Sequence, residues 1–328
     1  MVDSAKTAPP RVVVVTGPTA AGKTALAIEL AQRFDGEIVN ADSMQVYRFM
    51  DIGTSKPTPE QRASVPHHLL DVVTPNVPYS AGRYAVEARE ATARILERGK
   101  LPILAGGTGL YIRAFIEGLI EGAEADRGLR ETLEQEHEAA VRAGDPGRLH
   151  RRLAVTDPES AARIHPHDAR RVVRALEIEA RTGVPTSQVR RSHGFADRPY
   201  RTLHLALDME RAVLDARIDA RCAQMMQAGL LQEVRALLDR GYGPELPPMQ
   251  AIGYRHMLPV ARGSDTLANA LPLMQRDTRR FARRQRTWLR AVPEAVWMDP
   301  RELAAVFERV ERFLSCASDA GASASPTP

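Results

Sequence analysis

The sequence is poor in cysteine, in lysine and in long apolar runs. Its 328 residues include only two cysteines, Cys222 and Cys316, which lie far apart without ligand-like neighbours, so we expect neither a disulfide framework nor a zinc site. No apolar run approaches the ~20 residues that a membrane-spanning helix needs, and the N-terminal stretch MVDSAKTAPP lacks the apolar core of a signal peptide. These absences predict a cytoplasmic protein without a membrane segment.

Lysine is scarce because arginine takes its place almost everywhere. Of the 45 basic residues only Lys6, Lys23, Lys56 and Lys100 are lysine, and 41 acidic residues leave the net charge at +4. A retained lysine therefore indicates a position that suits a compact ammonium group better than a planar guanidinium. Hydrophobic residues make up 44% of the chain, which at this length predicts a large core and two domains, with a disordered tail at 317–328.

The stretch at 17–24, GPTAAGKT, has the spacing of a phosphate-binding loop. It follows the β-branched run at 12–15 and precedes a helix-like run, which is the context that the motif requires. Its backbone N–H groups can converge on one anion, the Lys23 ammonium can bind the outer phosphates, and the Thr24 hydroxyl can ligate Mg²⁺. The candidate phosphate-binding residues are Gly17, Pro18, Thr19, Ala20, Ala21, Gly22, Lys23 and Thr24.

Asp42 follows the second expected strand, at 37–41. Ligands bind beyond the carboxyl ends of the strands in an open parallel sheet, so we expect Asp42 near the phosphate loop. Its carboxylate could hold Mg²⁺ through water or accept a proton from a substrate, and it could equally cap a helix or a turn. The residues alone leave these roles open.

The stretch at 46–75 is rich in glycine and proline and weakly periodic, so it predicts a long ordered loop, and such loops are usually functional. His67, His68 and Asp71 lie in it and could suggest a metal site. Adjacent histidines point in different directions, however, and no further ligand follows at a useful spacing. We favour structural or substrate-loop histidines.

A second glycine-rich turn follows the third expected strand, at 101–105. The helix before this strand runs from 80 to 98, with Ser80 as its N-cap. The turn reads GGTG and would lie beside the phosphate loop in a doubly wound sheet. It suggests a close approach of backbone to a ligand, with the Thr108 hydroxyl presented to it.

The composition changes between 122 and 199, where charged helical stretches are joined by proline and glycine breaks. This change predicts a small helical insertion, after which the sheet resumes at 202–207. One of its helices has an apolar face (Val172, Val173, Leu176 and Ile178) and a basic face (Arg170, Arg171 and Arg174). An ordinary solvated helix has the same pattern.

Three further stretches stand out toward the C-terminus. A helix expected over 210–241 places Arg217 and Arg221 on one face, where they could bind a diphosphate or pair with neighbouring aspartates. The stretch at 249–255 predicts a loop-to-helix junction. The stretch at 275–290 carries seven arginines and one aspartate with interleaved aromatic residues, which suits RNA but also fits a basic amphipathic helix.

Together these patterns predict an α/β fold, a P-loop NTPase-like parallel sheet flanked by helices with a small all-helical insertion domain. The catalytic core would comprise 1–121 and 200–316, and the insertion would comprise 122–199.

The motifs resemble those of the bacterial tRNA dimethylallyltransferase family, also called tRNA isopentenyltransferases. In chain order the matching pieces are GPTAAGKT, NADSMQVYRFMDIGTSKP, HHLLDV, GGTGLYIRA, RALEI, ARIDAR, QAIGYR and RRQRTWLR. They extend from residue 11 to about residue 299. The phosphate loop alone is unspecific, whereas the stretches after Asp42, at GGTGLY and at RQRTWLR are specific.

The resemblance implies transfer of a dimethylallyl group from dimethylallyl diphosphate to the exocyclic amine of the adenosine 3′ of the anticodon, in tRNAs reading codons that begin with U. The phosphate loop, Arg217 and Arg221 would then hold the donor diphosphate, rather than ATP, with Mg²⁺ on Thr24. Asp42 would be the general base and Thr108 would line the channel. The insertion would bind the anticodon stem-loop, and a monomer is expected.

The resemblance also implies a set of tRNA contacts. These are Asp42, Ser43, Met44, Gln45, Thr108, Arg170, Arg171, Val172, Val173, Arg174, Gln250, Ala251, Ile252, Gly253, Tyr254, Arg255, Arg283, Arg284, Gln285, Arg286, Thr287, Trp288, Leu289 and Arg290.

Three rival functions are a small-molecule P-loop kinase, an adenylate isopentenyltransferase and a non-catalytic RNA-binding protein. The arginine-aromatic stretch and the insertion argue against the first two, because small acceptors need neither. Loss of transfer without loss of tRNA binding in an Asp42 variant would exclude the third.

Overall fold

The computed structural model describes residues 8–118, 126–193 and 198–316 and divides the chain into two compact units. One unit comprises Met1–Ile116 with Pro199–Pro328, and the other comprises Glu117–Arg198. The expected tail at 317–328 lies outside the described residues. None of the described helices combines the length and the apolar character needed to cross a membrane.

The larger unit is built on a six-stranded parallel sheet in the order β3-β2-β4-β1-β5-β6. The strands are β1 Arg11–Thr16, β2 Gly36–Asn40, β3 His67–His68, β4 Leu101–Ala105, β5 Arg201–Leu207 and β6 Ala295–Met298. The side chains of residues 12–15 in β1 are fully buried, as expected for a central strand covered on both faces. The parallel sheet of the predicted α/β fold is therefore confirmed.

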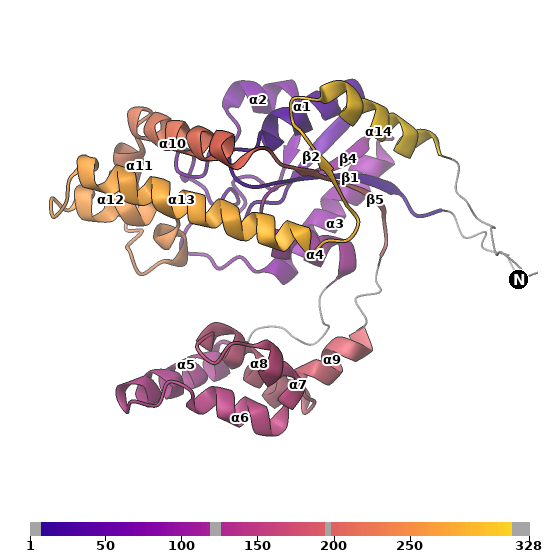
Figure 1. Ribbon diagram of the computed structural model, residues 1–328. Helices are drawn as coiled ribbons and strands as arrows, with labels where there is room; N and C mark the ends of the chain where they lie inside the picture. Colours follow the sequence, from indigo (N-terminus) through magenta and orange to yellow (C-terminus); the bar gives the residue numbers. More distant parts are fainter. Residues whose placement is uncertain (1–7, 119–125, 194–197, 317–328) are drawn as a thin grey trace, which may run out of the picture. The chain divides into compact units, whose positions relative to one another are not determined.

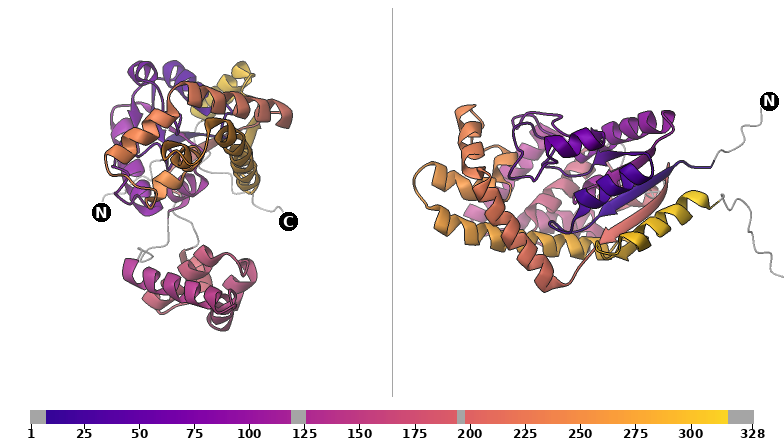
Figure 2. Two further views of the ribbon diagram at one scale, coloured as in Figure 1. Left: turned by 90° about the vertical axis from the view of Figure 1, so that its left-hand side faces the viewer. Right: turned by 90° about the horizontal axis from the view of Figure 1, so that it is seen from above.

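Helices cover both faces of this sheet (Figures 1 and 2). α1 Lys23–Arg33 and α14 Leu303–Ser315 share one face, where the rings of Phe34 and Phe307 meet edge to face at 6.3 Å. α3 Ala81–Glu97 and α4 Gly109–Glu117 share the other, where Tyr84 stacks on Tyr111 at 4.1 Å. α3 begins at Ser80, whose side chain accepts the Arg83 N–H as a predicted N-cap should.

The remaining elements of this unit lie at the carboxyl end of the sheet (Figure 1). They are α2 Pro59–Ser64, α10 Arg211–Gln227, α11 Leu230–Asp239, the 3₁₀ turn η1 Pro247–Gln250, α12 Tyr254–Ala261 and α13 Leu267–Arg290. Among them, α13 runs across that end (Figure 1). The junction expected at 249–255 is confirmed, since it joins η1 to α12.

Two expectations about these elements are wrong. The single helix expected over 210–241 is two helices, because Gly229 adopts a left-handed φ of 101° between α10 and α11. The stretch at 46–75 is not all loop: Thr58 caps α2 through a reciprocal bond with Gln61, and β3 adds a short edge strand.

The register of the sheet positions the candidate site. Val15 of β1 and Asn40 of β2 both lie opposite Ala105 of β4. The phosphate loop, the GGTG turn and Asp42 therefore leave the sheet at one level, with β4 between β1 and β2.

The smaller unit is all helical, as expected. It contains α5 Arg127–Arg142, α6 Arg148–Thr156, α7 Pro158–Arg163, α8 Ala169–Thr182 and α9 Thr186–His193. The apolar face of α8 packs with Leu133, Leu149 and Leu153 in the core of this unit. Glu177 of α8 is fully buried and accepts bonds from Arg130 at 2.7 Å and Arg174 at 2.9 Å, which hold its pKa below the ordinary value despite burial.

Candidate active site

The phosphate loop turns sharply between β1 and α1. A β-carbon at Gly17 would lie 2.8 Å from the carbonyl oxygen of Leu207, so only glycine fits there. Gly22 caps α1 with a φ of 96°, a left-handed conformation that also favours glycine. The loop is thus shaped to present backbone N–H groups and the N-terminus of α1 to an anion.

Lys23 is the half-buried cation of this loop. Its ammonium donates to the carbonyl of Pro18 at 2.8 Å. Its pKa is lowered to about 8, first by desolvation and then by the positive charge of Arg221, while the negative charge of Asp42 opposes both. Lys23, Arg221 and Asp42 therefore lie close enough to interact electrostatically. The structure thus brings the predicted phosphate-binding residues and the candidate general base together.

Arg221 reaches the loop from α10. Its Nε donates to Ser55 Oγ at 2.7 Å, and its Nη1 lies 3.5 Å from Thr19 Oγ1. Arg217, one turn earlier, has its Nη2 3.9 Å from the position that a β-carbon of Gly22 would take. Both guanidinium groups thus lie at the phosphate loop.

The nearby aspartates do not compete for these two arginines. Asp215 lies 3.7 Å from Arg211, and Asp219 pairs with Arg279 of α13. The alternative that the sequence left open, an Arg217–Arg221 surface pair with these aspartates, is therefore wrong.

Asp42 forms a turn through one carboxylate oxygen, and its other oxygen remains available to a substrate. Its Oδ1 accepts the N–H of Met44 at 2.8 Å, so the capping role that the sequence left open exists. The carboxylate is only half-buried, and its charge acts on Lys23. The turn therefore orients the second carboxylate oxygen without consuming it.

Thr108 locks the end of β2 to the GGTG turn. Its Oγ1 accepts the N–H of Ser43 at 2.9 Å and donates to Ser43 Oγ at 3.2 Å. A β-carbon at Gly106 would lie 2.1 Å from the carbonyl oxygen of Ala41, which explains the first glycine of this turn. Thr108 therefore positions the segment that carries Asp42.

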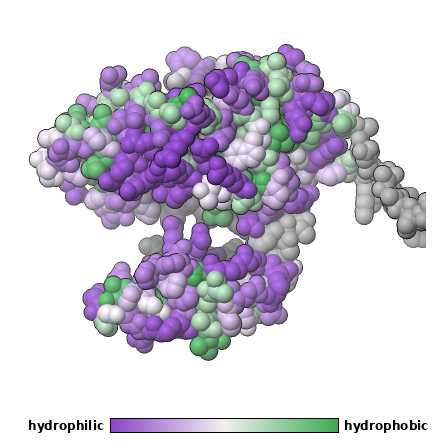
Figure 3. Space-filling view, in the orientation of Figure 1, coloured by the Kyte–Doolittle hydropathy of each residue, from purple (hydrophilic) through white to green (hydrophobic). Residues whose placement is uncertain are grey.

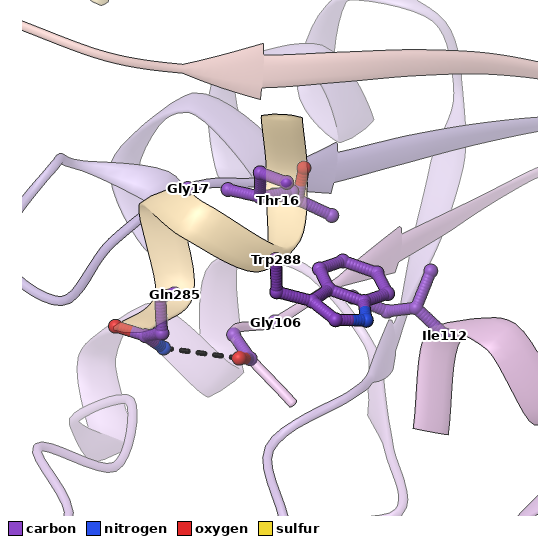
Figure 4. A pocket seen from close by; sticks show the side chains of 8 residues that line it. Thr16, Gly17, Gly106, Ile112, Gln285 and Trp288 are labelled. Carbon is purple, nitrogen blue, oxygen red and sulfur yellow. Dashed lines mark hydrogen bonds between the residues drawn. The ribbon is translucent and has the colours of Figure 1, made fainter. Parts of the chain in front are cut away.

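Gln285 of α13 joins the two glycine turns, a role that the sequence did not suggest; Figure 4 shows its bond to the GGTG turn. Its Oε1 accepts the N–H of Thr19 at 2.8 Å, and its Nε2 donates to the carbonyl of Gly107 at 3.0 Å. A β-carbon at Gly109 would lie 2.4 Å from the Trp288 ring, so the same helix also packs on the GGTG turn. The only signal in the sequence was the glutamine among the arginines of RRQRTWLR.

Several predicted tRNA contacts have side chains engaged inside the protein. Gln45 donates to the carbonyls of Thr54 and Ser55, Gln250 donates to the carbonyl of Pro244, Arg255 pairs with Asp277, and Arg286 pairs with Asp208. The side chains of Val172, Val173, Tyr254 and Leu289 are buried. The side chains of Val172, Val173, Tyr254 and Leu289 therefore serve the core, whereas Arg255 keeps 42% of its side chain exposed.

Only a few of the predicted tRNA contacts are basic residues with exposed side chains. Besides Arg255, they are Arg283, Arg284 and Arg290 on α13, with Thr287 beside them, and Arg170 and Arg171 on α8; Arg276 and Arg280 on α13 and Arg181 on α8 are exposed as well. In the space-filling view the middle of the face over α13 is largely hydrophilic (Figure 3), while Leu267 and Leu273 of the same helix are exposed apolar side chains. Phe281 is 36% exposed and Trp288 is half-buried, so α13 is a basic amphipathic helix that also offers an aromatic edge.

The residues at the loop fit a magnesium ion that is held largely by a diphosphate. Thr24 is the second residue of α1, next to Lys23. Its hydroxyl is a hard oxygen donor, which suits Mg²⁺, an ion that keeps several waters and phosphate ligands. Among residues 8–118, 126–193 and 198–316 no cluster of three histidine, cysteine or acidic side chains could hold an ion without such a ligand. His68 instead lies 2.7 Å from Glu37, and His67 bonds the carbonyl of Val65.

Comparison with known proteins decides the family. The family model described as IPP transferase matches residues 45–292, and the model described as isopentenyl transferase matches residues 10–73. The chain belongs to the IPP transferase family.

Relatives of this IPP transferase cover nearly its full length. It is 52% identical over 93% of its length to the tRNA dimethylallyltransferase of Desulfosudis oleivorans, 96% of which is covered, and 50% identical over 92% to that of Syntrophobacter fumaroxidans, with 87% covered. A crystal structure of the tRNA isopentenylpyrophosphate transferase of Bacillus halodurans superposes with a TM-score of 0.67 at 39% identity, covering 93% of this chain and 96% of that one. A eukaryotic dimethylallyltransferase acting on tRNA gives 0.80 at 30% identity, covering 93% and 80%.

Proposed function

We propose that this enzyme transfers the dimethylallyl group of dimethylallyl diphosphate to the exocyclic amine of the adenosine 3′ of the anticodon, in tRNAs reading codons that begin with U. Its membership of a prenyltransferase family supports the reaction class. The observation that carries the proposal is the convergence of Lys23, Arg221 and Asp42 at one edge of the sheet. A cationic cradle for a leaving group faces a carboxylate that can take a proton.

The cradle activates the donor. The loop N–H groups, Lys23, Arg217 and Arg221 bind the diphosphate, and Mg²⁺ held by Thr24 would neutralise further charge on it. As the bond between the allylic carbon and the diphosphate oxygen breaks, the leaving oxygen gains negative charge. Cations fixed by the fold stabilise this charge without reorganising, so ionisation becomes easier.

Asp42 serves the acceptor. The exocyclic amine of adenine is a weak nucleophile because its lone pair is delocalised into the ring. A carboxylate oxygen hydrogen-bonded to the amine orients it, and it accepts the proton once nitrogen has bonded to the allylic carbon. The turn bond from Met44 to Oδ1 holds the carboxylate in place for this step. The products are the N6-(dimethylallyl)adenosine in tRNA and diphosphate.

The adenine must leave the anticodon-loop stack to reach this carboxylate, at a cost of a few kcal/mol. The exposed arginines of α13 and of α8 can supply binding energy by contacting phosphates. A single chain carries all these groups, so we expect the monomer to be active.

The test is an assay with labelled dimethylallyl diphosphate and an anticodon stem-loop, followed by mass spectrometry of the nucleosides. We expect the Asp42→Asn variant, which keeps an acceptor oxygen for Met44, to lose at least ~10²-fold in transfer rate while its affinity for the stem-loop stays within twofold. Phosphorylation of a small acceptor by ATP, without any prenylation of the stem-loop, would show that the protein is a small-molecule kinase and would overturn the proposal. Full activity in the variant would remove Asp42 from the reaction.

A further inference from the structure

Ser55 has a strained backbone beside the phosphate loop. Its φ is 48°, in the left-handed region that residues with a β-carbon avoid. Strain of this kind persists only where the surrounding structure holds it, and it gathers at functional sites. The contacts of its backbone and of its side chain therefore bear on the function of this segment.

The segment around Ser55 is held from several sides. Glu233 of α11 accepts the N–H groups of residues 51, 52 and 53 at 2.9, 2.8 and 3.1 Å. The Gln45 amide donates to the carbonyls of Thr54 and Ser55 at 3.1 and 3.2 Å. The buried Lys56 ammonium binds Asp51 at 2.6 Å, so the backbone on both sides of the strained residue is tied down.

The side chain of Ser55 meets the donor site through Arg221. Its Oγ accepts the Nε–H of Arg221 at 2.7 Å, while the Nη1 of that guanidinium lies near Thr19 of the phosphate loop. A bond at Nε fixes the plane of the guanidinium and leaves Nη2, and the second N–H of Nη1, for a ligand. An arginine prepared in this way loses less conformational freedom on binding an anion.

We infer that Ser55 is a positioning residue that aims the Arg221 guanidinium at the donor diphosphate. The inference rests on the proposed function, because the anion is that of the donor. The competing explanation is structural: the bond between Ser55 and Arg221 only ties the loop to α10. The two explanations predict different diphosphate affinities for a variant that lacks the hydroxyl and adds no strain.

Ser55→Gly is such a variant, since glycine adopts a φ of 48° without penalty. We expect its Kd for inorganic diphosphate with magnesium, measured by calorimetry, to rise about tenfold, the effect of one hydrogen bond to a charged group. The kcat/KM for dimethylallyl diphosphate should fall by a similar factor, and the KM for the anticodon stem-loop should stay within twofold. The melting temperature should not fall.

A double-mutant cycle with Arg221→Lys supplies the control, because lysine has no Nε–H for the serine. In that background Ser55→Gly should change the Kd for diphosphate by less than twofold. Unchanged diphosphate binding in Ser55→Gly alone, or an equal loss in both backgrounds, overturns the inference while leaving the proposed function intact. Failure of the parent protein to bind diphosphate would overturn both.

Discussion

The Glu233 carboxylate should be among the most stabilising polar groups of the larger unit. It accepts three backbone N–H bonds from residues 51–53 and the hydroxyl of Tyr254 at 2.7 Å. In Glu233→Ala the fully buried Tyr254 loses its partner, at a cost of about 1–3 kcal/mol, and the partly buried N–H groups of Ile52 and Gly53 lose about 1 kcal/mol each. The exposed Asp51 N–H is rehydrated. The free energy of unfolding should therefore fall by about 3–5 kcal/mol.

Urea denaturation followed by tryptophan fluorescence measures this loss, because Trp288 and Trp297 both lie in the larger unit. Glu233→Gln keeps one acceptor oxygen and should lose about half as much. Glu308→Ala is the matched control: this carboxylate is 67% exposed and lies 3.4 Å from Arg312, so its removal should change stability by less than ~0.5 kcal/mol. A loss below ~1 kcal/mol in Glu233→Ala would refute the reasoning.

The other predictions concern α13. Changing Arg283 and Arg284 to alanine should weaken stem-loop binding and lower its salt dependence by up to about two counterions, and an unchanged salt slope would mean that neither contacts phosphate. Gln285→Glu should raise the Kd for diphosphate by at least ~10-fold, since it replaces the donor to Gly107 with a negative charge beside Lys23, and equal affinity would contradict this. Burial raises the pKa of Asp277, but hydrogen bonds from Arg255, Arg276 and His256 outweigh it and hold this pKa at about 2, below the usual 3.8. The stabilisation by Asp277 is therefore complete above pH 4 and lost toward pH 2, and Asp277→Asn should remove that part of the acid dependence of melting, on the order of 1–2 kcal/mol.

Local patterns explain why much of the fold could be predicted. The β-branched run of β1, the glycines of the phosphate loop and the N-cap at Ser80 specify their conformations through contacts within a few residues. β6 was missed because its four residues have no alternation or turn signal of their own and become a strand only by pairing with β5. The break at Gly229 was missed because a lone glycine is tolerated in many helices.

The candidate site divides in the same way. The sequence indicated Lys23, Asp42 and Thr108, because motifs and strand ends mark them. It could not decide whether Arg217 and Arg221 bind a diphosphate or pair with Asp215 and Asp219. The outcome depends on Arg211, one turn away, and on Arg279 of another helix, which pair with these aspartates instead.

By itself the sequence determined that a phosphate cradle, a carboxylate and a basic helix exist, since each is encoded in residues that are neighbours along the chain. Only the tertiary structure decided that Gln285 ties the helix to the cradle and that Ser55 holds Arg221, pairs separated by well over a hundred residues. Hydrogen bonds between such distant side chains depend on how whole elements pack, and no local propensity carries that information.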